Sequence, residues 1–250
     1  MSYFWKNSSL SLLEIWQQFV ANIKETRWQE WVSTATQVAS VWYARKNNVL
    51  VYPTGIIGVL LAAYVYFFQT HPPLYADASL NIYYFVMSVY GWYNWVQKKD
   101  AEHYTYPIKW CNRNELLFGI GFFIFFWIVI YFVLVKFTNS NTPVLDSLVS
   151  GSAVTAMWWM AKRKIENWIA WIFSNIVAIP LNFYKELMLF TLMYVLFLVL
   201  AWMGFVEWKK KVAVQKQPPW SRAMFTGTIW SFFLTNRNLL ALWFFARNNR

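Results

Sequence analysis

Two segments of this 250-residue chain place amides, hydroxyls and aromatic rings at steps of three, four or seven residues. The first stripe consists of Asn81, Tyr84, Ser88 and either Trp92 or Trp95; the second consists of Trp168, Trp171, Asn175 and, provided its helix continues through Pro180, Asn182. Residues at such steps share one face of a helix. Gln37 and Tyr194 would complete a ring around a cavity. Because aromatic faces attract flat cations and amides both donate and accept, the pattern predicts a binding site for a small polar molecule.

Catalytic chemistry finds little support in the sequence. The two histidines, His71 and His103, fall in loops predicted on opposite membrane faces, so they cannot share a metal ion. Neither a His-x-x-x-His pair, nor a nucleophile elbow, nor a phosphate-binding glycine loop is present. A single cysteine, Cys111, excludes an intrachain disulfide. We therefore predict no enzyme activity, no catalytic residue, no metal site and no cofactor.

Composition indicates a membrane protein. Hydrophobic residues make up 58% of the chain and charged residues only 13%, whereas about a quarter of the residues in a soluble domain are charged. Aromatic residues reach 22%, which suits rings at the headgroup level or around a ligand. No signal peptide is evident in residues 1–9, so the first span would direct insertion.

Seven transmembrane helices are predicted. The clearest is Leu116–Val135, twenty apolar or glycine residues, which is long enough to cross about 30 Å of hydrocarbon. The others are Trp31–Ala44, Pro53–Phe68, Ala76–Val96, Pro143–Ala161, Trp168–Pro180 and Leu187–Trp208. Pro53 and Pro180 are placed at helix ends, where proline disturbs backbone bonding least.

Lysine and arginine orient these helices, because cytoplasmic loops carry the positive excess. Seven spans put 17 of the 22 basic residues on one side, including eight from Lys209 onward. This predicts an outside N-terminus and a cytoplasmic C-terminus. The net charge of +11 then reflects orientation and attraction to anionic lipid, and nucleic-acid binding is the weaker interpretation.

Two flanking segments lie outside the spans. Apolar and polar residues alternate at helical spacing between Leu10 and Ile23, which predicts an amphipathic anchor along the membrane surface. The apolar tail from Ala223 to Ala246 is interrupted by Asn236-Arg237-Asn238. It is therefore predicted to be cytoplasmic, with an eighth span as the less favoured alternative.

An internal repeat organises the chain. The segment Gly91 to Trp95 returns 113 positions later as Gly204 to Trp208, again followed by lysines. Each glycine is expected to permit close packing, and each tryptophan to lie at the membrane interface. Gly119-x-Gly121 is likewise expected to mark helix packing.

Two three-helix units can run parallel only if one extra span separates them. The fold class is thus an all-α integral membrane protein with two parallel three-helix repeats joined by a linker helix. The predicted parts are an interfacial segment 1–30, a first repeat 31–97, a loop and linker helix 98–141, a second repeat 142–210 and a tail 211–250.

Several motifs resemble those of the bacterial nicotinamide riboside transporters called PnuC. They are Tyr52-Pro53-Thr54-Gly55-Ile56-Ile57-Gly58, Leu74-Tyr75-Ala76-Asp77, Tyr90-Gly91-Trp92-Tyr93-Asn94-Trp95, and the segment from Lys162 to Trp171 followed by Asn175. They occur in order between about residues 33 and 210. Tyr52 departs from the tryptophan expected before the proline, but it keeps an aromatic ring.

The resemblance implies a full-length relative of the SWEET sugar carriers in the bacterial inner membrane. It also implies facilitated uptake of nicotinamide riboside, homotrimers and trapping of the substrate by a cytoplasmic riboside kinase. The stripes contain no arginine or lysine, so we expect the phosphorylated form to be rejected. The alternatives are a carrier of another nucleoside, vitamin or sugar, with or without ion coupling, and a channel or structural subunit.

Overall fold

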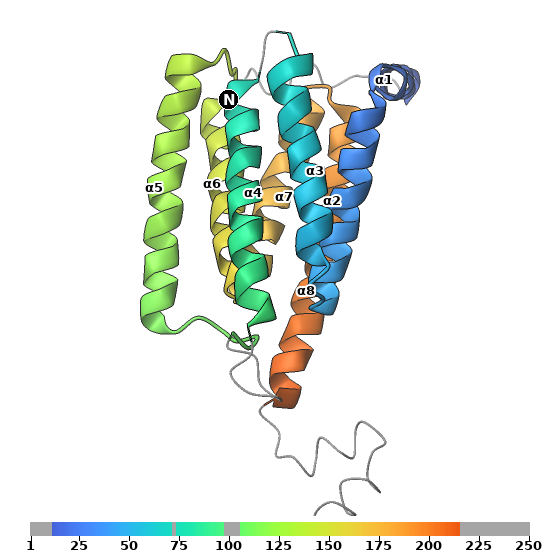
Figure 1. Cartoon of the computed structure of the whole chain (residues 1–250). Helices are drawn as coiled ribbons and strands as arrows, with labels where there is room; N and C mark the ends of the chain where they lie inside the picture. Colours follow the sequence, from blue (N-terminus) through green and yellow to red (C-terminus); the bar gives the residue numbers. More distant parts are fainter. Residues whose placement is uncertain (1–11, 72–73, 98–105, 216–250) are drawn as a thin grey trace, which may run out of the picture. The chain divides into compact units, whose positions relative to one another are not determined.

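The computed structural model describes residues 12–71, 74–97 and 106–215, and these ranges form helices joined by short loops (Figure 1). The helices are α1 (Leu12–Glu25), α2 (Trp28–Lys46), α3 (Val51–Tyr64), the π-helical turn η1 (Val65–Gln69), α4 (Tyr75–Val96), α5 (Arg113–Phe137), α6 (Pro143–Ala161), α7 (Glu166–Tyr184) and α8 (Met188–Gln215). The chain divides into two units, Met1–Trp208 and Lys209–Arg250. Of the second unit only the end of α8 is described. The predicted tail from Ala223 to Ala246, like His103, lies outside the described residues.

The predicted spans coincide with α2 to α8. Pro143–Ala161 matches α6 at both ends, and the other spans lie within their helices to within one residue. Within the described ranges, three segments are long and apolar enough to cross a membrane by length and composition: Val51–Gln69, Arg113–Phe137 and Met188–Gln215. The all-α fold class with several spanning helices is confirmed, and the count of seven spans stays a prediction.

The predicted end of a helix at Pro180 is wrong. α7 continues through this proline to Tyr184. Proline removes one backbone donor, but in a membrane protein neighbouring groups can satisfy the carbonyl that it frees. The continuation keeps Asn182 on the same helix as Trp171 and Asn175.

Local sequence accounts for the helix ends that matter for the site. Asn112 accepts a hydrogen bond from the Glu115 backbone at 2.8 Å, and Glu115 accepts one from the Asn112 backbone at 2.9 Å. This capping box starts α5. A left-handed residue follows each of α2 and α6: Asn47, at φ 58°, directly after α2, and Arg163, at φ 52°, two positions after the end of α6. A left-handed turn thus follows both helices, in positions that the predicted repeat would make equivalent.

Neighbouring helices in the sequence pack together. α3 contacts both α2 and α4, α6 contacts both α5 and α7, and α4 contacts α6 (Figure 1). Glycines permit these approaches: a Cβ on Gly119 would lie 2.1 Å from the Trp159 ring. The predicted packing role of Gly119 is confirmed, whereas Gly121 faces open space. α4 thus joins the first group of helices to the second.

The two ends of the helices differ in charge. One, called here the basic end, contains the C-terminal ends of α2, α4 and α6 and the N-terminal end of α7; Arg45, Lys46, Lys162, Arg163 and Lys164 lie there. The opposite end carries Asp77, Asp146 and Lys185. Leu13, Trp16 and Ile23 of α1 are exposed apolar side chains, as an interfacial anchor requires, although its place on a membrane stays a prediction.

Candidate functional site

The two predicted stripes meet at one aromatic contact. Tyr84 of α4 and Trp171 of α7 bring their ring centroids within 6.5 Å at an interplanar angle of 50°. Tyr84 also contacts Tyr83 at 5.9 Å. Since α4 belongs to the first predicted repeat and α7 to the second, this contact lies between the repeats. It is the point at which the sequence-predicted site residues come together.

Asn175 lies one helical turn beyond Trp171 on α7. Its side chain is only 3% exposed, and its amide makes no hydrogen bond with another described residue. Buried amides are normally paired, so one without a protein partner suits a ligand or water. Asn81, one turn before Tyr84, donates to the Asp77 carbonyl at 2.9 Å, and its own carbonyl oxygen stays available.

Tyr194 of α8 joins this region. Its hydroxyl group interacts electrostatically with the Tyr84 hydroxyl and with the Asp77 carboxyl group. Tyr66 of η1 is also near Tyr194 and Asp77, and the Asp77 side chain is exposed. We call Tyr84, Trp171, Asn175 and Tyr194 the central group. The sequence analysis missed Tyr66, which carries no signal within its apolar run, and named Asp77 only as part of a family motif.

The remaining predicted site residues lie elsewhere. Gln37 donates to Ser33 Oγ at 2.9 Å and packs over Gly58, between α2 and α3. Asn182 donates within its own helix to the Ala178 carbonyl at 2.8 Å. Ser88 is buried near Gly55, and Trp92 is 40% exposed. Their contact with a ligand stays a prediction.

Trp168 belongs to a different group, at the basic end. Tyr52, Trp95, Trp168 and Trp208 form a buried aromatic set, which we call the basic-end cluster. Trp95 and Trp208 are 1% and 0% exposed. The expectation that they lie at the membrane interface is therefore wrong, because both are enclosed by protein. Their indole N–H groups explain this, since each donates to a buried backbone carbonyl of another helix.

Charged groups of the predicted spans lie near the two ends. Residues 78–96, 116–135, 147–161, 167–184 and 187–206 contain no lysine, arginine, aspartate or glutamate. At the basic end Arg45 pairs with Glu207 at 3.1 Å and Lys164 with Glu115 at 2.6 Å. At the opposite end Lys185 pairs with Asp146 at 2.6 Å. The central group is thus polar and aromatic but uncharged.

Cys111 is a poor nucleophile in this environment. Burial, together with the nearby Glu166 carboxylate, raises the pKa of its thiol to about 12. The thiolate is the reactive form of cysteine, and it is scarce at neutral pH when the pKa is this high. Among the described residues, no group of three or more His, Cys, Asp or Glu side chains could hold a metal ion.

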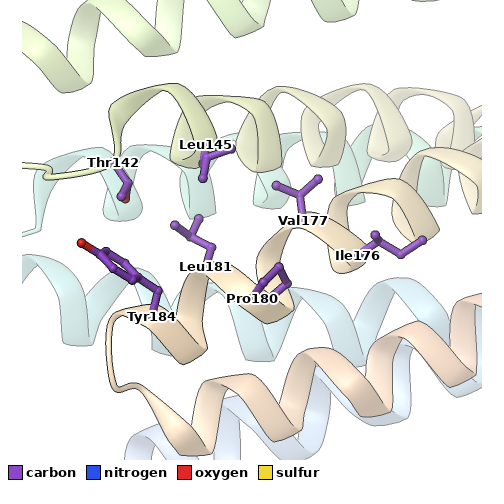
Figure 2. Close-up of a pocket in the computed structure, with 7 residues that line it drawn as sticks. All are labelled: Thr142, Leu145, Ile176, Val177, Pro180, Leu181 and Tyr184. Carbon is purple, nitrogen blue, oxygen red and sulfur yellow. The ribbon is translucent and has the colours of Figure 1, made fainter. Parts of the chain in front are cut away.

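A separate pocket of about 260 Å³ lies between α6 and α7, beside Pro180 (Figure 2). Its walls are Thr142, Leu145, Ile176, Val177, Pro180, Leu181 and Tyr184. They are mostly apolar and offer no amide side chain. Only the hydroxyls of Thr142 and Tyr184 could pair with a ribose or a carboxamide there, so this pocket suits such a ligand less well than the central group.

Residues 27–210 match the family model described as nicotinamide mononucleotide transporter. The match covers most of the chain and all of the helices that contribute to the central group. The chain belongs to the nicotinamide mononucleotide transporter family. As a member of this family it is a relative of transporters, which agrees with the prediction that it is not an enzyme.

Three curated transporters are similar in sequence to this chain. The nicotinamide riboside transporter PnuC of Escherichia coli K12 is 22% identical over 205 residues, covering 72% of this chain and 84% of the relative. PnuC of Neisseria mucosa is 27% identical over 198 residues, covering 74% and 73%. The riboflavin/roseoflavin transporter RibM of Streptomyces davaonensis is 24% identical over 154 residues, covering 59% and 70%. The predicted resemblance to PnuC is confirmed.

A solved structure has the same fold. The crystal structure of the vitamin B3 transporter PnuC aligns with a TM-score of 0.60 and 24% identity, covering 81% of this chain and 89% of that one. The helical arrangement described above is thus the fold of that transporter.

Proposed function

We propose that this protein carries nicotinamide riboside across the bacterial inner membrane by facilitated diffusion. The contact between Tyr84 and Trp171, with Asn175 one turn away, is the observation that carries the proposal. The riboside has a flat cationic ring, a carboxamide and a ribose. Aromatic faces attract such a cation by about 0.5 to 2 kcal/mol. Asn175 can pair with the carboxamide or a ribose hydroxyl, because amides both donate and accept.

The same residues argue against a phosphorylated substrate. A phosphate is held by arginine, lysine or a helix N-terminus, and the stretches that form the central group contain no basic residue. Arg45, Lys164 and Lys185 are engaged in ion pairs at the two ends. The proposed substrate is therefore the riboside, with its mononucleotide excluded.

Asp77 extends the proposal to the approach of the substrate. Its exposed carboxylate lies near Tyr66 and Tyr194, whereas Asp146 pairs with Lys185 and accepts hydrogen bonds from the Ser140 and Thr142 hydroxyls. An ionised carboxylate attracts a cation over a distance of up to about 8–10 Å at physiological salt. Asp77 would thus draw the cationic riboside towards the central group from the opposite end.

The wider proposal concerns orientation and assembly. The basic end faces the cytoplasm, the N-terminus lies outside and the C-terminus inside. A cytoplasmic kinase phosphorylates the riboside after uptake. The central group has no cation to bind the phosphate of the product, so the product cannot leave through the transporter. The protein works as a homotrimer, and residues 31–97 and 142–210 act as the two repeats that move around the bound substrate.

Counterflow in liposomes tests the transport proposal. Liposomes loaded with unlabelled nicotinamide riboside should accumulate labelled riboside through the purified protein with no ion gradient, and the rate should saturate. Exchange only under an imposed proton or sodium gradient would replace facilitated diffusion with ion coupling. Exchange that never saturates would favour a channel, and no exchange would favour a different substrate or a structural role.

Riboflavin is the second candidate substrate, because the relative RibM is named for it. Its ring system is larger and uncharged, so it gains less from the aromatic faces and the Asp77 carboxylate than a pyridinium does. Competition in the same counterflow assay separates the two. Unlabelled nicotinamide riboside should abolish uptake of the label, and riboflavin at equal concentration should leave it unchanged.

A further inference from the structure

Two tryptophans of the basic-end cluster bond to equivalent positions in opposite halves of the chain. Trp95 of α4 donates through its indole N–H to the Met160 carbonyl near the end of α6, at 3.1 Å. Trp208 of α8 donates to the Ala44 carbonyl near the end of α2, at 3.0 Å. Ala44 and Met160 each precede a left-handed residue by three positions. The two bonds thus form a reciprocal exchange between the first helical group and the second.

The rings repeat the same symmetry. Tyr52 meets Trp95 edge to face at 5.1 Å and 88°, and Trp168 meets Trp208 edge to face at 5.5 Å and 88°. Trp95 and Trp208 contact each other at 5.9 Å in the middle of the set. Gly91 and Gly204 make room, since a Cβ on either would lie 2.5 Å from the ring of Tyr52 or Trp168. All four residues are at most 1% exposed, so the set is enclosed by protein.

This closure leaves two polar atoms without a partner. The Tyr52 hydroxyl and the Trp168 indole nitrogen are buried and have no hydrogen-bond acceptor or donor among the described residues. The two side chains occupy matching places: the Tyr52 hydroxyl lies beside Gly91, and the six-membered ring of the Trp168 indole lies beside Gly204. Buried polar atoms without partners are rare and costly, and water would satisfy both if the helices parted. The two unpaired atoms therefore raise the free energy of the closed cluster and favour its opening. A cluster that only joined helices permanently would gain nothing from unpaired atoms.

We propose that Trp95 and Trp208 form a reciprocal latch that closes the transport pathway at the basic end and opens during each transport cycle. The inference rests on the proposed function, because only a transported substrate requires this end to open. Opening parts Trp95 from Trp208 and releases the Met160 and Ala44 carbonyls. Since each tryptophan holds a helix of the other half, loss of either bond loosens the same closure.

Cysteine accessibility tests the latch without any substrate. Ser88 and Ala201 are both 2% exposed and lie seven residues, or two turns, before Trp95 and Trp208 on the same helix faces. Each is changed to cysteine in a Cys111→Ser background. A membrane-impermeant maleimide is then added to vesicles of both orientations. The observed quantity is the labelling rate from each side.

The latch variants are Trp95→Phe and Trp208→Phe, which keep an aromatic ring but remove the donor. Each should raise labelling from the basic end by roughly fivefold, the change expected for loss of one neutral hydrogen bond. Trp202→Phe is the matched control, because Trp202 lies on α8 but is 60% exposed, and it should label like the parent. Size-exclusion elution confirms that each variant is folded, and if one fails to fold the other carries the test.

Labelling that stays unchanged in the folded latch variants, or rises only from the opposite side, would overturn the latch. Failure of the riboside proposal would show itself separately, as absent counterflow of labelled riboside in the parent protein. Faster labelling together with absent counterflow would support the latch and reject the proposed substrate.

Discussion

The central group and the basic-end cluster are both aromatic, yet their polar atoms are used in opposite ways. In the basic-end cluster Trp95 and Trp208 commit their N–H groups to backbone carbonyls at 3.1 and 3.0 Å, and their rings are enclosed. In the central group Asn175 is buried without such a bond, and Tyr84 and Trp171 meet at a wider 6.5 Å. The basic-end cluster therefore joins helices, whereas the central group leaves polar groups available to bind a ligand. Changes in the cluster should therefore alter stability, and changes in the central group should alter affinity.

The largest effect is expected from adding one methyl group inside the cluster. Gly204→Ala would place a Cβ 2.5 Å from the Trp168 ring, and Gly91→Ala would place one at the same distance from Tyr52. Such overpacking lowers the free energy of unfolding by about 1–3 kcal/mol. Thermal unfolding of the purified protein in detergent measures it as a lower midpoint temperature.

Gly121→Ala is the control for these variants, because a Cβ there meets nothing within 4 Å. It should leave the midpoint close to that of the parent. If all three alanine variants unfold at the same temperature, close packing at Gly91 and Gly204 does not contribute to stability.

Asn175→Ala should have the next largest effect, and on affinity instead of stability. Losing one amide that pairs with the ligand weakens binding about tenfold, by analogy with other buried hydrogen bonds. Isothermal titration with nicotinamide riboside measures the change. Ile176→Ala, at the next and 54% exposed position, should bind like the parent. Equal affinities for the two variants would move the site away from α7.

Trp171→Leu sharpens the electrostatic part of the comparison. Removing the ring should weaken binding of the cationic riboside by about 0.5–2 kcal/mol. The reduced riboside has a neutral ring, so its affinity should fall less. The affinity for the cationic riboside divided by that for the reduced riboside should therefore be lower in Trp171→Leu than in the parent protein. A parallel loss for both forms would mean that Trp171 contributes contact area without attracting the cation.

The smallest effect concerns Cys111, which lies outside both regions. A thiol pKa raised to about 12 leaves little thiolate at neutral pH. Native Cys111 should therefore react with maleimide far more slowly than the same thiol after denaturation in detergent, and faster as the pH rises towards 12. Rapid labelling of the native protein at pH 7 would contradict the burial of this thiol.

The fold was largely predictable from the sequence because apolar length and charge are local signals. Residues 116–135 lack any charge, and the helix around them extends only to Arg113 and Phe137. The helix end predicted at Pro180 was wrong. Proline costs a helix one backbone hydrogen bond, and packing against other helices offsets that cost, but such packing cannot be seen in the sequence. Gly91 and Gly204 were correctly assigned to packing, since a repeated glycine beside aromatic residues has few other uses.

The site was predictable only in part, because helical spacing fixes a face but not its neighbour. It placed Tyr84, Trp171 and Asn175 on faces that do meet between α4 and α7. It could not show that Gln37 would bond to Ser33 and pack on Gly58. It also assigned Trp95 to the membrane interface, although the indole N–H of Trp95 bonds to the Met160 carbonyl inside the protein. Met160 lies 65 positions further along the chain, and nothing in the sequence indicates that the two residues meet.

Equilibrium binding of nicotinamide riboside and its mononucleotide to the purified protein tests the central claim most directly. The central group offers rings and amides but no cation, so the riboside should bind saturably and the mononucleotide at least about tenfold more weakly, as for a charged group without a paired donor. A mononucleotide that binds as tightly as the riboside, or a riboside that does not bind at all, would contradict the account.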